Sequence, residues 1–193
     1  MKNNRYGQAA ILSDSDYSKI RKNIRSKKYK LLLDLAWFTG ERWGALVQLR
    51  VSDVYNQDGT PRSYITFKSH TRKASPDGKR QTRQVIAHSV LVEALQAYKP
   101  DHDCEYLFPN REQNNHINLR SADKILRASV ERAGLDAKGI STHSTRRSFI
   151  TKLHCNGVDL YTIKKITGHK DLKSLERYVD ISADRIKGAI EAL

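Results

Sequence analysis

The chain contains 193 residues, which is enough for one sizeable domain with a hydrophobic core, or at most two small domains. Its 35 Lys and Arg residues against 21 Asp and Glu residues give a formal net charge of +14 and a sequence pI near 9.8. Such a balance is typical of nucleic-acid-binding proteins. The two distant cysteines, Cys104 and Cys155, exclude a disulfide framework and a cysteine-based zinc site.

Secreted and membrane proteins are also disfavoured. The first residues are polar and basic without an apolar segment, so we expect no secretory leader. The most apolar stretch, from Leu31 to Phe38, is short and interrupted by Asp34, so we expect neither a membrane-spanning segment nor a membrane partner. Few, separated cysteines fit a reducing compartment, and we therefore expect a cytoplasmic protein.

The N-terminal region predicts helices. Residues 1–11 are expected to be a linker or N-terminal extension. Ser13 and Asp16 have the spacing of a capping box, which predicts a helix that begins there. The apolar stretch after it recurs at helical spacing and predicts a second helix that ends at Gly40. A third helix with Leu46 inside would follow at once, which places Arg42 near its start.

The middle of the chain predicts a small sheet. Tyr64–Phe67 and Arg83–Ala87 are short β-rich runs on either side of a polar segment, which predicts a hairpin with a long basic loop. Asp53–Tyr55 is a candidate third strand. Ser89 is the predicted cap of a helix to about Lys99, and a further helix is predicted from Ser121 to Gly134.

The C-terminal region is helical again. We predict helices from Ser144 to Cys155, from Asp159 to Gly168, from Asp171 through Tyr178, and from Ser182 onward. The predicted fold class is therefore α+β and mainly α-helical, with helices around a small antiparallel three-stranded sheet. The elements do not alternate as βαβ units, so a doubly wound nucleotide-binding fold is disfavoured.

Two basic runs favour a surface that lies along phosphates. The segment from Arg21 to Lys30 has six basic residues and no acidic ones. The segment from Arg62 to Arg83 has seven basic residues against Asp77 alone. Each run alone is equally consistent with a solvated face, but the two runs flank the segment around Arg42 and together indicate binding to nucleic acid.

Five residues in a fixed order point to chemistry at a DNA phosphate: Arg42, His143, Arg146, His169 and Tyr178. Taken singly, each is common on protein surfaces or, for the tyrosine, in half-buried packing. His143 and Arg146 are three positions apart at a helix start, so both can project from one face. An arginine there presents a fork of N–H donors that matches two phosphate oxygens.

At these residues the sequence resembles the catalytic domain of the tyrosine recombinases, the phage integrase family. His143-Ser-Thr-Arg146 is similar to the family's His-x-x-Arg box. Gly168-His169, with Tyr178 nine positions after the histidine, is similar to its Gly-His box and nucleophile. Thr39-Gly40-Glu41-Arg42 resembles the box of the first arginine. The resemblance covers roughly residues 12–183 and implies a DNA breaking-rejoining fold for a catalytic domain of residues 12–193.

The resemblance implies a role for each residue. Arg42 and Arg146 would meet the charge that develops on the scissile phosphate, and His169 would add a hydrogen bond. Tyr178 would attack phosphorus and form a 3′-phosphotyrosyl intermediate. His143 would serve as a base or a phosphate ligand. No cofactor and no metal is expected, because the arginines would carry the charge.

In the resembling family a hairpin lysine protonates the leaving 5′-oxygen. Thr71-Arg72-Lys73 resembles that turn best, so Lys73 is the candidate general acid, with Lys68 and Lys79 as alternatives.

Two positions depart from the family pattern. Ala45 stands where many relatives place an acid, and Glu41 stands where a nonpolar residue is common. An acid beside Arg42 can either orient this arginine or quench its charge.

The resemblance implies a site-specific DNA recombinase or integrase domain, that is, a DNA strand transferase with double-stranded DNA as its partner. No further DNA-clamping domain is recognised, so we expect an isolated catalytic domain of a larger bacterial or phage protein. Such a protein would assemble as a tetramer on paired DNA sites, while the domain alone could be monomeric. Two alternatives stay open: relaxation of DNA in the manner of type IB topoisomerases, and a basic DNA-binding module that has lost catalysis.

Overall fold

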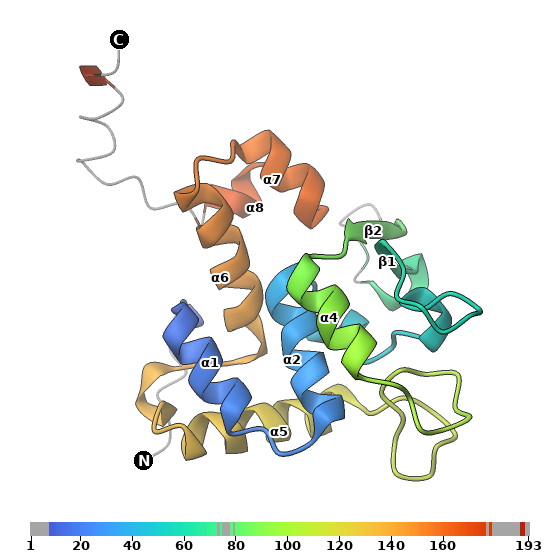
Figure 1. Ribbon diagram of the computed structural model, residues 1–193. Coiled ribbons are helices and arrows are strands. Elements are labelled where there is room, and N and C mark those ends of the chain that lie inside the picture. The colour runs from blue at the N-terminus through green and yellow to red at the C-terminus, as the bar shows by residue number, and fades with distance from the viewer. Residues whose placement is uncertain are drawn as a thin grey trace. The chain divides into compact units, whose positions relative to one another are not determined.

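The computed structural model describes residues 8–72, 74, 78, 80–176, 178 and 190–191. Its elements follow the order in Figure 1. They are α1 (Asp14–Lys22), α2 (Lys27–Thr39), α3 (Trp43–Leu46), η1 (Val51–Asp53), β1 (Tyr64–Phe67), η2 (Ser69–Thr71), β2 (Arg83–Ile86), α4 (Ser89–Ala97), α5 (Leu119–Arg132), η3 (Asp136–Lys138), α6 (Thr142–Cys155), α7 (Leu160–Thr167) and α8 (Lys173–Glu176). The predicted α+β class, mainly helical, is confirmed.

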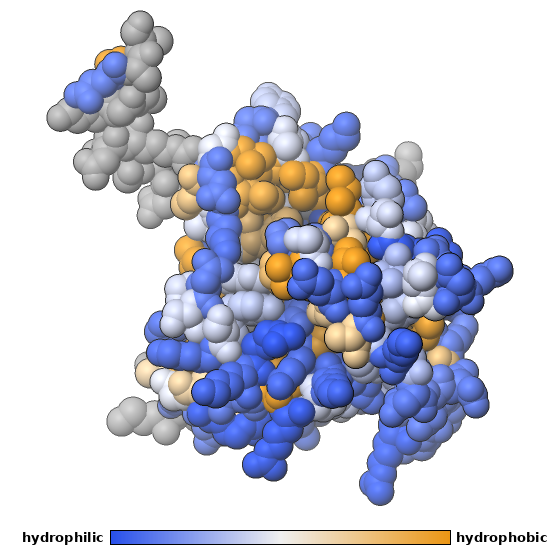
Figure 2. Space-filling model, in the orientation of Figure 1, coloured by the Kyte–Doolittle hydropathy of each residue, from blue (hydrophilic) through white to orange (hydrophobic). Residues whose placement is uncertain are grey.

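The chain divides into two compact units, Met1–Phe149 and Ile150–Leu193. In the first unit α2 packs against α3 and α4, and α5 packs against α1 and α3 (Figure 1). Hydrophilic residues cover much of the face of these elements that Figure 2 shows. Within the described residues, no helix is both long and apolar enough to cross a bilayer.

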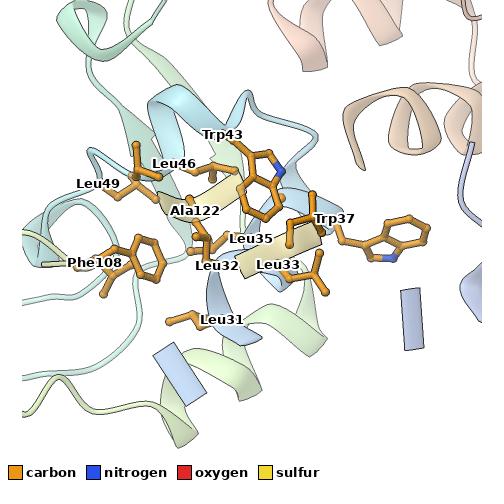
Figure 3. Packing of buried hydrophobic residues seen from close by; sticks show 14 of the residues in the cluster. Leu31, Leu32, Leu33, Leu35, Trp37, Trp43, Leu46, Leu49, Phe108 and Ala122 are labelled. Atoms are coloured by element: carbon orange, nitrogen blue, oxygen red, sulfur yellow. The ribbon is translucent and has the colours of Figure 1, made fainter. Parts of the chain in front are cut away.

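The core of the first unit centres on α2. Eight of its thirteen residues are buried, since apolar side chains occur on nearly every side of this helix. Figure 3 shows Leu32 and Leu35 of α2 beside Trp43, Leu46 and Ala122, which come from α3 and α5. This packing fixes α3 directly after α2 and thereby places the segment that contains Arg42.

Helices α1 and α2 confirm the predicted start and stop signals. The Ser13 side chain accepts a hydrogen bond from the Asp16 N–H, and the Asp16 carboxylate accepts one from the Ser13 N–H, as a capping box requires. Helix α2 ends at Gly40, which adopts the left-handed conformation with φ of 59°. The third predicted helix is only four residues long, and Arg42 is its N-cap.

The predicted hairpin is confirmed. Strands β1 and β2 are antiparallel, with Tyr64 opposite Ile86 and Phe67 opposite Arg83. Among the described residues the sheet has these two strands.

The third strand expected at Asp53–Tyr55 is wrong. Its first residue closes the 3-10 helix η1, because the Asp53 carboxylate accepts a hydrogen bond from the Arg50 N–H at 2.9 Å. Such local side-chain hydrogen bonds compete with strand formation. Tyr55 then makes a single bridge to Pro61.

Three helix starts differ from the prediction, and in two of them another residue caps the helix. The cap of α4 is His88, whose Nδ1 accepts from the Val90 N–H, and not Ser89. Helix α5 begins before Ser121 because the Asn118 side chain accepts a hydrogen bond from the Ser121 N–H. Helix α6 begins at Thr142, two residues earlier than predicted.

The second unit contains the end of α6 followed by α7 and α8. Asp159 caps α7 as predicted, and Gly168 ends it with φ of 68°. Asp171 accepts a hydrogen bond from the Ser174 N–H at the start of α8. Helix α8 stops at Glu176, so Tyr178 lies in the turn after it and not on the helix, with its N–H bonded to Leu175. The helix predicted from Ser182 falls largely outside the described residues.

Replacement of Gly40 by alanine should destabilise the protein through two additive effects. A non-glycine residue in the left-handed conformation costs about 1–2 kcal/mol. The new Cβ would also lie 2.3 Å from Cδ1 of Phe149, and forcing that ring aside adds about 1–3 kcal/mol. The matched control is Gly134→Ala, where φ is 67° but no atom lies within 4 Å of the new Cβ. Urea unfolding would contradict this explanation if both variants lost the same stability.

Candidate active site

Two hydrogen bonds join the corner between α2 and α3 to the first turns of α6. Arg146 donates from Nη1 to the carbonyl of Gly40 at 2.8 Å. Trp43 donates from Nε1 to the hydroxyl of Thr145 at 3.1 Å. All four groups are in buried or nearly buried surroundings, so these bonds are shielded from competition with water. Segments about a hundred residues apart in sequence are thereby held side by side.

A cavity of about 180 Å³ opens at this junction. Three residues that the sequence singled out line it: Arg42, His143 and Arg146. Arg42 is partly exposed, His143 is exposed, and Arg146 is buried with 3% of its surface accessible. Within the first unit, the structure thus brings together the predicted residues of both arginine boxes. The full lining is Glu41, Arg42, Trp43, Gly44, Ala45, Thr71, Arg72, Leu119, Thr142, His143 and Arg146.

A buried carboxylate stands beside this cavity. Glu41 is 1% exposed. Its Oε2 lies 2.7 Å from Nη1 of Arg83 and 3.3 Å from Nε of Arg72, while its Oε1 lies 3.7 Å from Nη1 of Arg146. Oε1 also accepts a hydrogen bond from the backbone N–H of Arg42 at 2.9 Å. One acid therefore contacts three guanidinium groups from two distant parts of the sequence.

These contacts keep Glu41 ionised. Burial by itself would raise the pKa of this carboxyl. The positive charges of Arg83, Arg146 and Arg72 outweigh burial and hold the pKa below its ordinary value. Because guanidinium groups remain protonated in proteins, the cluster is charged at neutral pH.

Arg72 and Arg83 were missed as part of the site by sequence reasoning. Arg83 opens β2, yet it is 6% exposed and also donates from Nη2 to the carbonyl of Thr39 at 3.0 Å. Arg72 lines the cavity and its side chain is 9% exposed. Glu41 was the one sequence feature that could have indicated them, because a buried acid requires cations as partners. The sequence did not identify which arginines these partners are.

Of the three candidate hairpin lysines, the structure describes Lys68. Lys73 and Lys79 lie outside the described residues. Lys68 directly follows β1, and its Nζ lies 3.4 Å from Oδ1 of the buried Asp53. The assignment of Lys73 as general acid therefore stays a prediction.

The second unit brings His169 and Tyr178 together. Their ring centroids are 6.2 Å apart with a tilt of 54°. The backbone carbonyl of Tyr178 accepts a hydrogen bond from the Thr151 hydroxyl at 3.3 Å, which ties the turn to α6. The histidine follows Gly168, the left-handed residue that ends α7.

A buried threonine contacts the ring of His169. The Thr167 hydroxyl lies 2.6 Å from the Ile163 carbonyl and 2.6 Å from Nδ1 of His169. A hydroxyl has one proton, and a carbonyl can only accept, so Thr167 donates to Ile163. We therefore predict that Nδ1 carries a proton and donates to Thr167. In that tautomer, Nε2 of His169 would donate only when the ring is a charged imidazolium.

Together, the structure shows a mainly helical domain and, in its first unit, a cavity lined by arginine and histidine side chains. Residues 10–185 match the phage integrase family, and the chain belongs to this family. Similar proteins include the tyrosine recombinase XerD of Corynebacterium glutamicum, 30% identical over 158 residues that make up 82% of this chain and 50% of that protein. The XerD of Rhizobium meliloti is 27% identical over 185 residues, 96% of this chain and 56% of that protein. The chain thus spans about half the length of the curated relatives it matches.

Solved structures share the fold. The XerA recombinase has a TM-score of 0.75 at 22% identity, covering 96% of this chain and 66% of that one. The catalytic domain of bacteriophage HP1 integrase has a TM-score of 0.62 at 19% identity, covering 95% of both chains. The XerH site-specific recombinase bound to its difH substrate has a TM-score of 0.67 at 21% identity, covering 94% of this chain and 53% of that one. The predicted fold of the tyrosine recombinase catalytic domain is confirmed.

The tautomer of His169 gives a direct prediction. Thr167→Val keeps the shape of this buried side chain but removes the oxygen that accepts from Nδ1, so the Nδ1–H tautomer should lose its preference in the neutral ring. Nitrogen-15 NMR of the histidine ring distinguishes the two tautomers. Thr167→Ser retains the hydroxyl and should resemble the wild type. An unchanged tautomer in Thr167→Val would mean that another group holds the Nδ1 proton.

Proposed function

We propose that the chain is the catalytic domain of a site-specific DNA recombinase or integrase, which cuts and rejoins DNA through a 3′-phosphotyrosyl intermediate. The observation that carries the proposal is that Arg42, His143 and Arg146 line one cavity, although a hundred residues separate the first from the other two. The family and its named recombinases support the same activity.

The chemistry follows from the residues. The Tyr178 hydroxyl gives up its proton, with His143 as base, and its oxygen forms a bond to phosphorus. The bond from phosphorus to the 5′-oxygen breaks, and Lys73 supplies the proton that this oxygen takes. Arg42 and Arg146 donate to the non-bridging oxygens as their negative charge grows. Reversal with a different 5′-hydroxyl rejoins the strands without an external energy source.

In this reaction His169 donates from Nε2 to the same phosphate. With Nδ1 protonated, as the contact to Thr167 predicts, a donating Nε2 requires the imidazolium form, which adds one positive charge to the site. We propose that His169 acts in this charged state, with no metal and no cofactor needed to meet the phosphate charge.

The proposal extends to domain organisation and partners. Residues 12–193 would form the catalytic domain and residues 1–11 a linker, within a larger protein that acts in the cytoplasm. Double-stranded DNA would be the partner, and the Tn1549 transposon integrase, which shares the fold, was solved in complex with transposon right end DNA. A tetramer on two DNA sites would perform the exchange, because each site offers two strands to cut.

The nucleophile can be tested by trapping. A nicked suicide DNA should form a covalent adduct with the wild type and none with Tyr178→Phe, because phenylalanine lacks the attacking oxygen. Tyr161→Phe is the matched control, since Tyr161 lies in the same unit and is 71% exposed. Adduct from Tyr178→Phe would point to a different nucleophile. A wild type that binds DNA yet never forms adduct would instead support an inactive binding module.

The general acid can be found by changing the leaving group. A sulfur in place of the bridging 5′-oxygen departs without a proton, so it removes the need for an acid that otherwise contributes about 10²–10⁴ in rate. Lys73→Ala should therefore be impaired on ordinary DNA and recover on the 5′-thio substrate. Lys68→Ala and Lys79→Ala should lose modest activity on both substrates. Rescue of either of these two variants would move the acid to that lysine.

A further inference from the structure

Glu41 lies beside the arginines of the proposed site, where a carboxylate could neutralise the positive charge that binds phosphate. Its contacts indicate that it does not. Its carboxylate is buried at the end of α2 and contacts three guanidinium groups. One negative charge cannot neutralise three positive ones, so the cluster keeps an excess of positive charge. Arg42, whose side chain lines the cavity, adds to that excess. A phosphate anion in the cavity would therefore still meet a positive field.

The distances show how the carboxylate is shared. The shortest contact, 2.7 Å, is to Arg83, which does not line the cavity. The contacts to Arg72 and Arg146, which do line it, are longer at 3.3 Å and 3.7 Å. Arg83 thus makes the closest ion pair with Glu41. Glu41 contacts Arg72 and Arg146 at longer distances, so both guanidinium groups can still donate hydrogen bonds to an anion.

Arg146 and Arg72 are also anchored by backbone carbonyls. Arg146 donates from Nη1 to the Gly40 carbonyl at 2.8 Å, and Arg72 donates from Nη1 to the Gln81 carbonyl at 2.9 Å. Arg72 is contacted at two nitrogens, Nε by the carboxylate and Nη1 by the carbonyl, while both contacts of Arg146 are made at Nη1. In both cases a carbonyl and a carboxylate together restrict the guanidinium group. Restricted guanidinium groups are what a pentavalent phosphate requires, because donors that are already in place need no reorganisation.

We propose that Glu41 is a positioning residue that orients Arg146 and Arg72 toward the scissile phosphate, and that Arg72 is a third phosphate-binding arginine. This inference rests on the proposed function of the same site. The chain has this acid at position 41 and alanine at position 45, where many relatives place an acid.

Four proteins test the inference: the wild type, Glu41→Gln, Glu41→Asp and Glu105→Gln. The last is the matched control, because it removes one carboxylate charge from a surface pair with Arg50, where Glu105 is 54% exposed. Each protein is assayed for DNA affinity and for the rate of adduct formation on a nicked suicide substrate.

Positioning predicts a split between binding and chemistry. Glu41→Gln should bind DNA at least as tightly as the wild type, because it carries one negative charge fewer, but should form adduct about 10²-fold more slowly. Glu41→Asp keeps the charge but withdraws the carboxylate by one methylene, and should also be slower. Glu105→Gln should cleave like the wild type. Cleavage by Glu41→Gln at the wild-type rate or faster would overturn the inference, since the acid would then only quench the arginines.

A second measurement does not depend on cleavage. The Nε–Hε signals of Arg72 and Arg146, assigned with Arg→Lys variants, should be individually dispersed in the wild type and in Glu105→Gln. They should move to the position of mobile arginines in Glu41→Gln, or in Glu41→Asp if the glutamine variant does not fold. Unchanged signals would overturn the positioning role. Absence of adduct with the wild type would defeat the proposed function alone, and the NMR signals would still decide whether Glu41 positions these arginines.

Discussion

The geometry of the first unit depends on how charge is buried at the corner between α2 and α3. A lone carboxylate in that apolar corner would be costly, and breaking a buried ion pair by removal of one partner typically costs about 3–5 kcal/mol. The stability of the fold therefore requires that Glu41 stay paired with its arginines. Because Arg83 belongs to β2 and Arg146 to α6, satisfying this one acid draws the hairpin and α6 to the corner. The same ion pairs therefore contribute both to the packing of the first unit and to the arrangement of the cavity.

The corner between α2 and α3 also depends on how closely the backbone of Gly40 approaches α6. Gly40 reverses the chain in a left-handed conformation, and its missing side chain leaves room for the ring of Phe149 on α6. The carbonyl of Gly40 is then available to accept from Arg146. A carbonyl at the end of a helix carries partial negative charge, which suits a guanidinium partner. The glycine thus has a packing role and an electrostatic role at once.

The sequence predicted those parts that depend on local signals. The capping box at Ser13, the left-handed stops at Gly40 and Gly168, and the cap at Asp159 each rest on residues within a few positions of one another. The hairpin strands also followed from their own composition. Predictions were wrong where a neighbouring side chain competed, as Asp53 did when it closed a 3-10 turn in place of a strand.

The residues that line the cavity also show that local sequence signals predict only part of the site. Motif spacing identified Arg42, His143 and Arg146, since each belongs to a recognisable box. Arg72 lies in a basic run where every cation has the same local surroundings, so no nearby residue marks it. Its place beside Glu41 results from hairpin packing across some thirty positions of sequence, a long-range effect that local patterns do not contain.

The pair of departures at positions 41 and 45 forms one consistent arrangement. Ala45 is 2% exposed and lines the same cavity as Glu41, so a carboxylate at either place would need the same few arginines as partners. A second buried acid would cancel more of the positive charge that a phosphate anion is proposed to meet, and would leave less for it. Because residue 45 is alanine, it does not compete with Glu41 for ion pairs with Arg72 and Arg146. Position 41 also places that acid next to the N–H of Arg42, which donates to Oε1 and so fixes the backbone from which the first arginine projects. A single carboxylate can therefore orient all three arginines of the cavity, two through their side chains and one through its backbone.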